Sequence, residues 1–182
     1  MCSVADGPPV PYMIRMSVAF TREEDLEATA ADLPDRPISP HPNLVTPTGL
    51  AAIEAELASA RAAYSGAQAQ GSIEADRTAM ARATRDLRYW SARRATAQVV
   101  EVTADGRVRF GGTVTIARED AKTGLRREQT WRIVGDDEAD PTAGSVSHVS
   151  PLARALSGKR VGDEAVVAGQ TVEIVAVDQD GH

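Results

Sequence analysis

The sequence is short of the residues on which several protein classes depend. Its 182 residues hold one cysteine, Cys2, so a disulfide framework or a cysteine metal cluster within one chain is excluded. No apolar run is long enough to cross a bilayer, and the N-terminus lacks the basic stretch, apolar core and cleavage site of a secretory signal. We therefore expect a cytoplasmic protein without membrane contact, in which Cys2 is a passenger.

Motifs for self-contained chemistry are also missing. There is no nucleophile elbow, phosphate loop or dinucleotide fingerprint. The three histidines lack the i, i+4 spacing and the nearby acids of a zinc site: His41, His148 and His182. The sequence predicts no metal site, no cofactor of its own and no enzyme activity of its own.

Charge is distributed unevenly along the chain. The net charge is −6, and residues 1–46 and 99–182 each carry −4. Residues 47–98 carry seven arginines against five acids, a net +2. This pattern indicates one basic element that contacts a polyanion or an acidic protein surface. The residues expected to form its basic strip are Arg77, Arg82, Arg85 and Arg88. The alternative is a solvated helix face, because arginine is a good helix former.

Residues 1–45 are predicted to form a Pro-rich arm, partly disordered. Prolines from Pro34 to Pro42 are spaced so that neither a helix nor a paired strand could persist up to Pro47. Thr21 and Glu24 have the spacing of a capping box, which predicts one short helix over residues 22–32.

Residues 46–98 are predicted to form an antiparallel helical hairpin, a coiled coil. Apolar residues follow alternating steps of three and four, and Gly71-Ser72 supplies a turn between two such runs. Pro47 after Thr46 is typical of a helix start. Each arm would be roughly 35 Å long. The alternative is two helices of a compact bundle, but the sequence offers no third amphipathic helix. The seam residues are Leu50, Ile53, Leu57, Ala60, Tyr64 and Ala67, then Ile73, Met80, Leu87, Ala83, Trp90 and Ala97.

Residues 99–182 are predicted to form a small antiparallel sheet packed by one helix, which makes the chain α+β. Ser150 and Pro151 begin the helix and Gly158 ends it. The predicted strands are the β-branched runs 99–102, 113–116, 130–134 and 171–177.

Four acids follow the third of these runs in R-I-V-G-D-D-E-A-D, residues 132–140. Their spacing suggests a calcium loop, but position six is Pro141 instead of glycine and position twelve is Ser147 instead of glutamate. A paired-carboxylate acid/base site is a further alternative. Loops of acids after a strand are more often solvated surface, which is the interpretation we favour from the pattern.

Segments of the C-terminal half resemble one family. These are V-R-F-G-G-T-V-T-I (108–116), R-I-V-G-D-D-E-A-D (132–140), S-P-L-A-R-A-L-S-G-K (150–159) and V-G-D-E-A-V-V (161–167). They are similar to the C-terminal domain of the bacterial transcript-cleavage factors GreA and GreB, over nearly all of residues 99–178. The resemblance implies an FK506-binding-protein-like (FKBP-like) fold after the coiled coil. The arm has no counterpart in the family.

The resemblance also implies a mechanism. A monomer would dock on core RNA polymerase, and the hairpin would enter the secondary channel towards backtracked nascent RNA in the elongation complex. Tip acids would share Mg²⁺ with the polymerase active centre. The docking residues implied are Asp136, Ser147, Val149, Ser150 and Pro151, where the family usually has Asp or Asn in place of Val149.

The hairpin tip departs from the family. Ser72 replaces an aspartate, and each arm is shorter by about one heptad, roughly 10 Å. Because catalytic geometry tolerates about 0.5 Å, we expect weak or absent cleavage stimulation. The remaining tip acids are Glu74 and Asp76.

Three alternatives stay open at this point. One is a non-cleaving polymerase-binding regulator that resembles the nucleoside diphosphate kinase regulator. Another is an FKBP-like prolyl isomerase, although residues 99–182 hold only Phe110 and Trp131 to line an aromatic pocket. The third is a free-standing nucleic-acid binder that uses the arginine helix.

Overall fold

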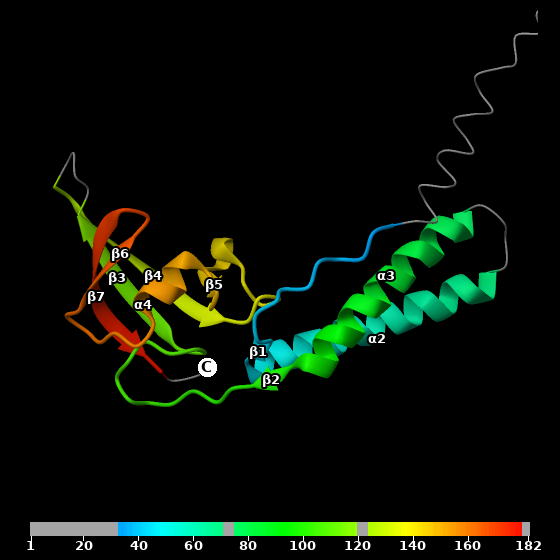
Figure 1. Cartoon of the computed structure of the whole chain (residues 1–182), viewed down its shortest axis with the longest axis horizontal. Coiled ribbons are helices and arrows are strands. Elements are labelled where there is room, and N and C mark those ends of the chain that lie inside the picture. The colour runs from blue at the N-terminus through cyan, green and yellow to red at the C-terminus, as the bar shows by residue number, and fades with distance from the viewer. Residues whose placement is uncertain (1–32, 71–74, 120–123, 180–182) are drawn as a thin grey trace, which may run out of the picture.

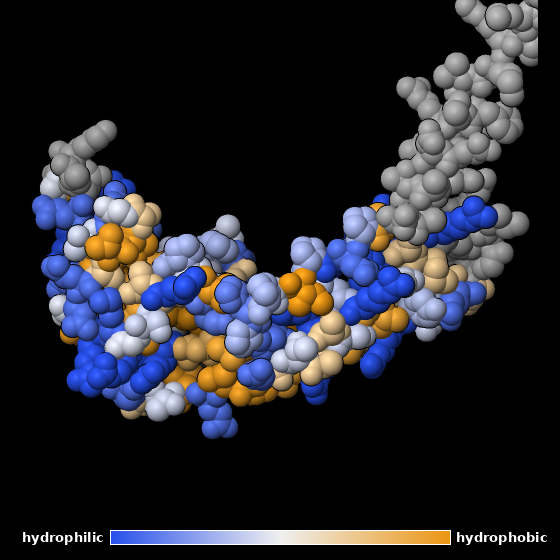
Figure 2. Space-filling model, in the orientation of Figure 1, coloured by the Kyte–Doolittle hydropathy of each residue, from blue (hydrophilic) through white to orange (hydrophobic). Residues whose placement is uncertain are grey.

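The computed structural model describes residues 33–70, 75–119 and 124–179. A pair of long helices projects from a small sheet domain, so the molecule is elongated and gently curved (Figure 1). Figure 2 shows apolar side chains gathered on the surface where these two parts meet. The mixed α and β composition predicted from the sequence is confirmed. The predicted helix over residues 22–32 lies outside the described residues.

The long helices are α2 (Pro47–Gln70) and α3 (Ala75–Thr96), and they pack side by side. Ile53, Leu57 and Ala60 of α2 are buried, as is Ala83 of α3. The helices run antiparallel, because Glu54 near the start of α2 accepts from Arg94 near the end of α3 at 2.7 Å. Neither helix is apolar enough along its described length to cross a membrane.

Two short strands close the base of the helical pair. β1 (Leu44–Val45) pairs in parallel with β2 (Gln98–Val99). Two predictions are therefore wrong. A paired strand does form before Pro47, and the strand expected over 99–102 is replaced by the two-residue strand β2, which belongs to a separate two-stranded sheet with β1. The proline-free stretch at the end of the arm explains the pairing, because its backbone accepts from Gln98 (2.8 Å) and Val100 (3.1 Å).

The main sheet has five strands in the order β5-β4-β3-β7-β6. Their bounds are β3 (Thr113–Glu119), β4 (Arg126–Val134), β5 (Ser145–Ser147), β6 (Glu164–Val167) and β7 (Gln170–Asp178). All neighbours are antiparallel except β4 and β5, which are parallel. The prediction of a purely antiparallel sheet is wrong at this edge, because the loop after β4 carries the 3₁₀ turn η1 (Pro141–Ala143) and returns the chain in the same direction.

One short helix, α4 (Pro151–Leu156), packs on the sheet. Ser150 caps it, since its hydroxyl accepts from the Ala153 N–H at 3.1 Å. Ala153 and Leu156 are buried in the core of the sheet domain. The other buried core residues are Val108, Val114, Ile116, Ile133, Val146, Ala165, Val172 and Ile174. The core thus fixes both β4 and α4. The loop that follows β4, residues 135–140, carries the four acids and is called the acid loop; it lies between these two elements in the chain.

Candidate functional site

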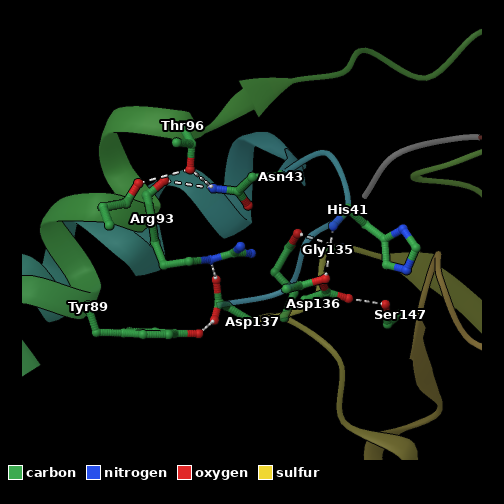
Figure 3. Close-up of polar contacts among 12 residues, drawn as sticks. His41, Asn43, Tyr89, Arg93, Thr96, Gly135, Asp136, Asp137 and Ser147 are labelled. Carbon is green, nitrogen blue, oxygen red and sulfur yellow. Dashed lines mark hydrogen bonds and ion pairs between the residues drawn. The ribbon is translucent and has the colours of Figure 1, made fainter. Parts of the chain in front are cut away.

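The loop after β4 lies between the sheet domain and the helical pair, and Figure 3 shows its contacts. Asp137 accepts from Arg93 Nε at 2.5 Å and from the Tyr89 hydroxyl at 2.6 Å. The Arg93 side chain is only 2% exposed and that of Asp137 10%. Asn43 donates to the Arg93 carbonyl at 2.7 Å and to the Thr96 hydroxyl at 3.1 Å. One carboxylate therefore fastens α3 to the sheet domain.

The contact with Asp137 also changes the chemistry of Tyr89. Burial, followed by the hydrogen bond to Asp137, raises the pKa of Tyr89 to about 12. The neutral phenol is the donor that this carboxylate requires, so both effects favour the protonated form. Tyr89 consequently remains a donor to Asp137 at physiological pH.

The next acid in the loop, Glu138, binds the start of α2. Its carboxylate accepts from the hydroxyl of Thr46, from the Thr46 N–H at 3.1 Å and from the Gly135 N–H at 3.3 Å. The Thr46 hydroxyl accepts from the Gly49 N–H at 3.0 Å, which caps α2. A Cβ at Gly49 would overlap the Glu138 side chain, so the approach of loop and helix requires glycine there.

We call Thr46, Tyr89, Arg93, Asp137 and Glu138 the joint. Our interpretation of the acid loop as solvated surface is wrong at Asp137 and Glu138, because both carboxylates accept hydrogen bonds from residues of α3 or from the start of α2. The partners lie 44 to 92 residues away in the chain, so no local pattern could identify them. The one sequence feature that indicated a distant carboxylate partner was Arg93, which has no acid three or four residues away on its own helix.

The predicted docking residues do come together. The Ser147 hydroxyl donates to Asp136, and it accepts from the Val149 N–H at 3.2 Å. The Ser150 N–H donates to the Ser147 carbonyl at 2.9 Å. Pro151 is exposed at the first position of α4. We call Asp136 and residues 147–151 the docking turn, a compact surface whose shape is held by Asp136 and Ser147.

The last acid of the loop shapes the loop itself. Asp140 caps η1, accepting from the Thr142 N–H at 2.9 Å and from the Ala143 N–H at 3.3 Å. Hydrogen bonds from Thr142 hold the pKa of Asp140 below its ordinary value. Each acid with calcium-loop spacing thus has protein partners. Among the described residues, no group of three or more His, Cys, Asp or Glu side chains could hold a metal ion.

The arginines predicted to form a basic strip lie along α3, but several are paired. Arg85 contacts Asp86 at 3.6 Å, and Arg88 contacts Asp35 of the arm at 3.3 Å. Arg77 and Arg82 are exposed. Acids on the same helix are few, but carboxylates that pair with arginines of α3 come from the arm, α2 and the acid loop.

The structure describes little of the tip candidates Glu74 and Asp76. Glu74 falls outside the described residues. Asp76 is the second residue of α3, and its side chain is also outside what the structure describes. The pair itself spans 24 and 22 residues, about 36 and 33 Å at 1.5 Å per residue.

Residues 103–179 match the family described as transcription elongation factor, GreA/GreB, C-terminal. The GreA of Hyphomonas neptunium is 54% identical over 76 residues, which cover 41% of this chain and 46% of that protein. The GreA of Vibrio parahaemolyticus is 45% identical over 86 residues, covering 46% and 50% respectively. The chain therefore spans about half the length of the curated relatives it matches.

Solved structures of related factors align over more of the chain at lower identity. GreA factor homolog 1 (Gfh1) of Thermus thermophilus is 20% identical with a TM-score of 0.33, covering 75% of this chain and 99% of that one. A GreA/GreB factor of Nitrosomonas europaea is 19% identical with a TM-score of 0.32, covering 76% and 98%. Residues 103–179 of this chain therefore match the C-terminal domain of the GreA/GreB family.

Proposed function

We propose that the chain is a transcription elongation factor that binds core RNA polymerase and modulates elongation. The observation that carries this proposal is the 54% identity to a GreA over the domain that contains the docking turn. The docking turn is also prearranged, because Asp136 and Ser147 fix its shape within the free protein. A surface ordered before binding loses less conformational entropy on association. We extend the proposal to an FKBP-like fold for the sheet domain and a monomer in solution.

In this proposal the helical pair is the element that enters the secondary channel. The joint supports it, since Asp137 and Glu138 hold α3 and α2 to the domain that docks. A pair fixed at its base can direct its tip, whereas a loosely tethered pair would sweep a wide range of directions. The pair would act as a coiled coil directed by the docking turn.

We propose further that cleavage stimulation is weak or absent. Glu74 and Asp76 are the carboxylates that would share Mg²⁺ with the polymerase active centre. A reach shorter than the family's by roughly 10 Å leaves them short of it, because two-metal chemistry requires placement within about 0.5 Å. The closest functional analogy is then a non-cleaving regulator that resembles the nucleoside diphosphate kinase regulator.

A prolyl isomerase is less well supported. A hollow of about 240 Å³ on the sheet domain is lined mainly by charged residues: Arg118, Glu119, Arg126, Glu164 and Glu173, with Ala117 and Thr171. Such a lining differs from the apolar, aromatic pocket that binds a prolyl peptide. We therefore keep polymerase binding as the proposed function.

A stalled, backtracked elongation complex from the same organism tests this proposal. We expect the wild-type chain to bind the complex without measurably accelerating RNA shortening, and we expect the same of the double variant Glu74→Ala/Asp76→Ala. Labelled RNA on a denaturing gel gives the shortening rate, and co-elution on a sizing column gives binding in the same samples.

The exposed acid Glu101 offers a control outside the tip, as Glu101→Ala. Rapid shortening that the double variant abolishes and Glu101→Ala preserves would show that the tip is catalytic despite its length. Absence of co-elution for every form would instead contradict polymerase binding.

A further inference from the structure

Residues 33–43 of the arm run from β1 out along α3, and we call them the strap (Figure 1). They contain no helix or strand, and their contacts with α3 are made by side chains of the strap. The Arg36 guanidinium lies 3.8 Å from the ring centroid of Tyr89 and 5.0 Å from that of Trp90. The two rings meet edge to face at 5.0 Å. A cation over a paired aromatic surface is a specific contact, since it requires both the charge and the ring faces.

Charge complementarity reinforces this placement. Arg36 also contacts Asp86 at 3.6 Å, and its neighbour Asp35 contacts Arg88 at 3.3 Å. An acid and a base next to each other in the strap therefore meet a base and an acid on α3. Asn43 anchors the other end through its bonds to α3. The strap contacts residues 86–96 of α3, and Arg88 is the member of the predicted basic strip that it pairs with.

Arg36 also lines a hollow between α2 and α3. A hollow of about 160 Å³ is lined by Arg36, by Ser59, Ala60 and Ala63 of α2, and by Ala83 and Trp90 of α3, with Glu56 and Asp86 at its edge. The small residues of both helices leave room in which the arginine stem can lie. Arg36 is the strap residue that lines this hollow together with both helices.

We propose that the strap is an intramolecular mask, which pairs Asp35 with Arg88 of α3 and must be released before an acidic or polyanionic surface of RNA polymerase can pair with that arginine. This inference rests on the proposed function. The carboxylate of Asp35 already pairs with Arg88, so a partner that uses the same arginine competes with it.

The contacts are suited to a mask that opens. The Asp35–Arg88 pair is about two-thirds exposed on both sides, and exposed ion pairs contribute little to stability. The attachment depends mainly on Arg36. If the mask is closed most of the time, the apparent affinity for the partner equals the intrinsic affinity multiplied by the fraction of molecules that are open.

Arg36→Ala tests the mask. We expect the variant to bind core polymerase about fivefold more tightly than the wild type, because a larger fraction is open. Arg36→Lys, which keeps the charge near the rings, should restore most of the wild-type affinity. Arg127→Ala, which removes an exposed arginine from β4, is the control and should leave affinity unchanged. Binding is measured by titrating labelled chain with core polymerase at one fixed salt concentration.

A second measurement follows the strap in the free protein. In a Trp131→Phe background, Trp90 is the only tryptophan, and Arg36→Ala should change its fluorescence whereas Arg127→Ala should not. Equal polymerase affinity of wild type and Arg36→Ala, or weaker binding by Arg36→Ala, would overturn the mask while leaving the proposed function intact. Failure of both forms to bind would overturn the two together, and binding by Arg36→Ala alone would support both.

Discussion

Asp137→Ala is expected to lower the free energy of unfolding by about 3 kcal/mol, because it leaves the Arg93 guanidinium buried without its counter-charge. The Arg93 side chain is 2% exposed, so water cannot take the place of the lost carboxylate without a rearrangement. The Tyr89 hydroxyl loses its acceptor as well. Urea denaturation followed by far-ultraviolet circular dichroism measures the change.

Asp35→Ala is the matched control, since it removes a carboxylate from an exposed arginine pair and should cost less than about 1 kcal/mol. Arg93→Met combined with Asp137→Ala should recover part of the loss, because no buried charge then remains unpaired. Equal effects of Asp137→Ala and Asp35→Ala would contradict the structural role assigned to the joint.

The ionisation of Tyr89 reports independently on the contact between Tyr89 and Asp137. Its raised pKa, about 12, means that the folded state favours the neutral phenol. The resulting stabilisation is complete below the ordinary tyrosine value near 10 and is lost as pH rises from there to about 12. In Asp137→Ala, the ultraviolet titration of tyrosinate should shift towards the ordinary value.

Gly135→Ala is expected to cost about 2 kcal/mol, because a Cβ there would lie 2.5 Å from the carbonyl oxygen of Leu44. That atom belongs to the backbone of β1, so it cannot rotate away as a side chain could. Relief requires the loop and β1 to separate, which also weakens the contact of Glu138 with Thr46. Urea denaturation measures the loss, and amide hydrogen exchange at Gln98 reports on β1–β2 pairing.

Gly66→Ala is the matched control for this substitution. Gly66 lies within α2, and nothing lies within 4 Å of a Cβ placed there. Alanine is the better helix former, so we expect this change to stabilise the protein by about 0.5 to 1 kcal/mol. A Gly135→Ala protein as stable as the wild type would show that the loop and β1 are not tightly packed.

Local patterns predicted the elements that carry strong local signals. Thr46-Pro47 and Ser150-Pro151 begin α2 and α4 in the structure, and the β-branched runs lie in β3, β4 and β7. β1, β2 and β5 are two or three residues long, and their pairing comes from tertiary contacts that no short run reveals. The parallel pairing of β5 likewise depends on the path of the acid loop.

The joint and the strap were beyond sequence reasoning for the same physical reason. Asp137 reads as one more acid in a charged loop until α3 places Arg93 beside it. Arg88 reads as an unpaired base until the strap brings Asp35 to it. Charge counted within one segment misses pairs formed between segments. The resemblance supplied the residues of the docking turn, and the structure adds the contacts that hold them, while their role in docking stays a prediction.

Equilibrium binding of the full chain to core RNA polymerase from the same organism measures the interaction on which the proposed function depends. We predict saturable one-to-one binding that Asp136→Ala weakens about tenfold, because the docking turn loses the acceptor that orients Ser147. Asp163→Ala, on the same domain but outside the docking turn, should bind like the wild type. No saturable binding by the wild type would contradict polymerase binding. Equal binding by Asp136→Ala and the wild type would contradict the role of the docking turn.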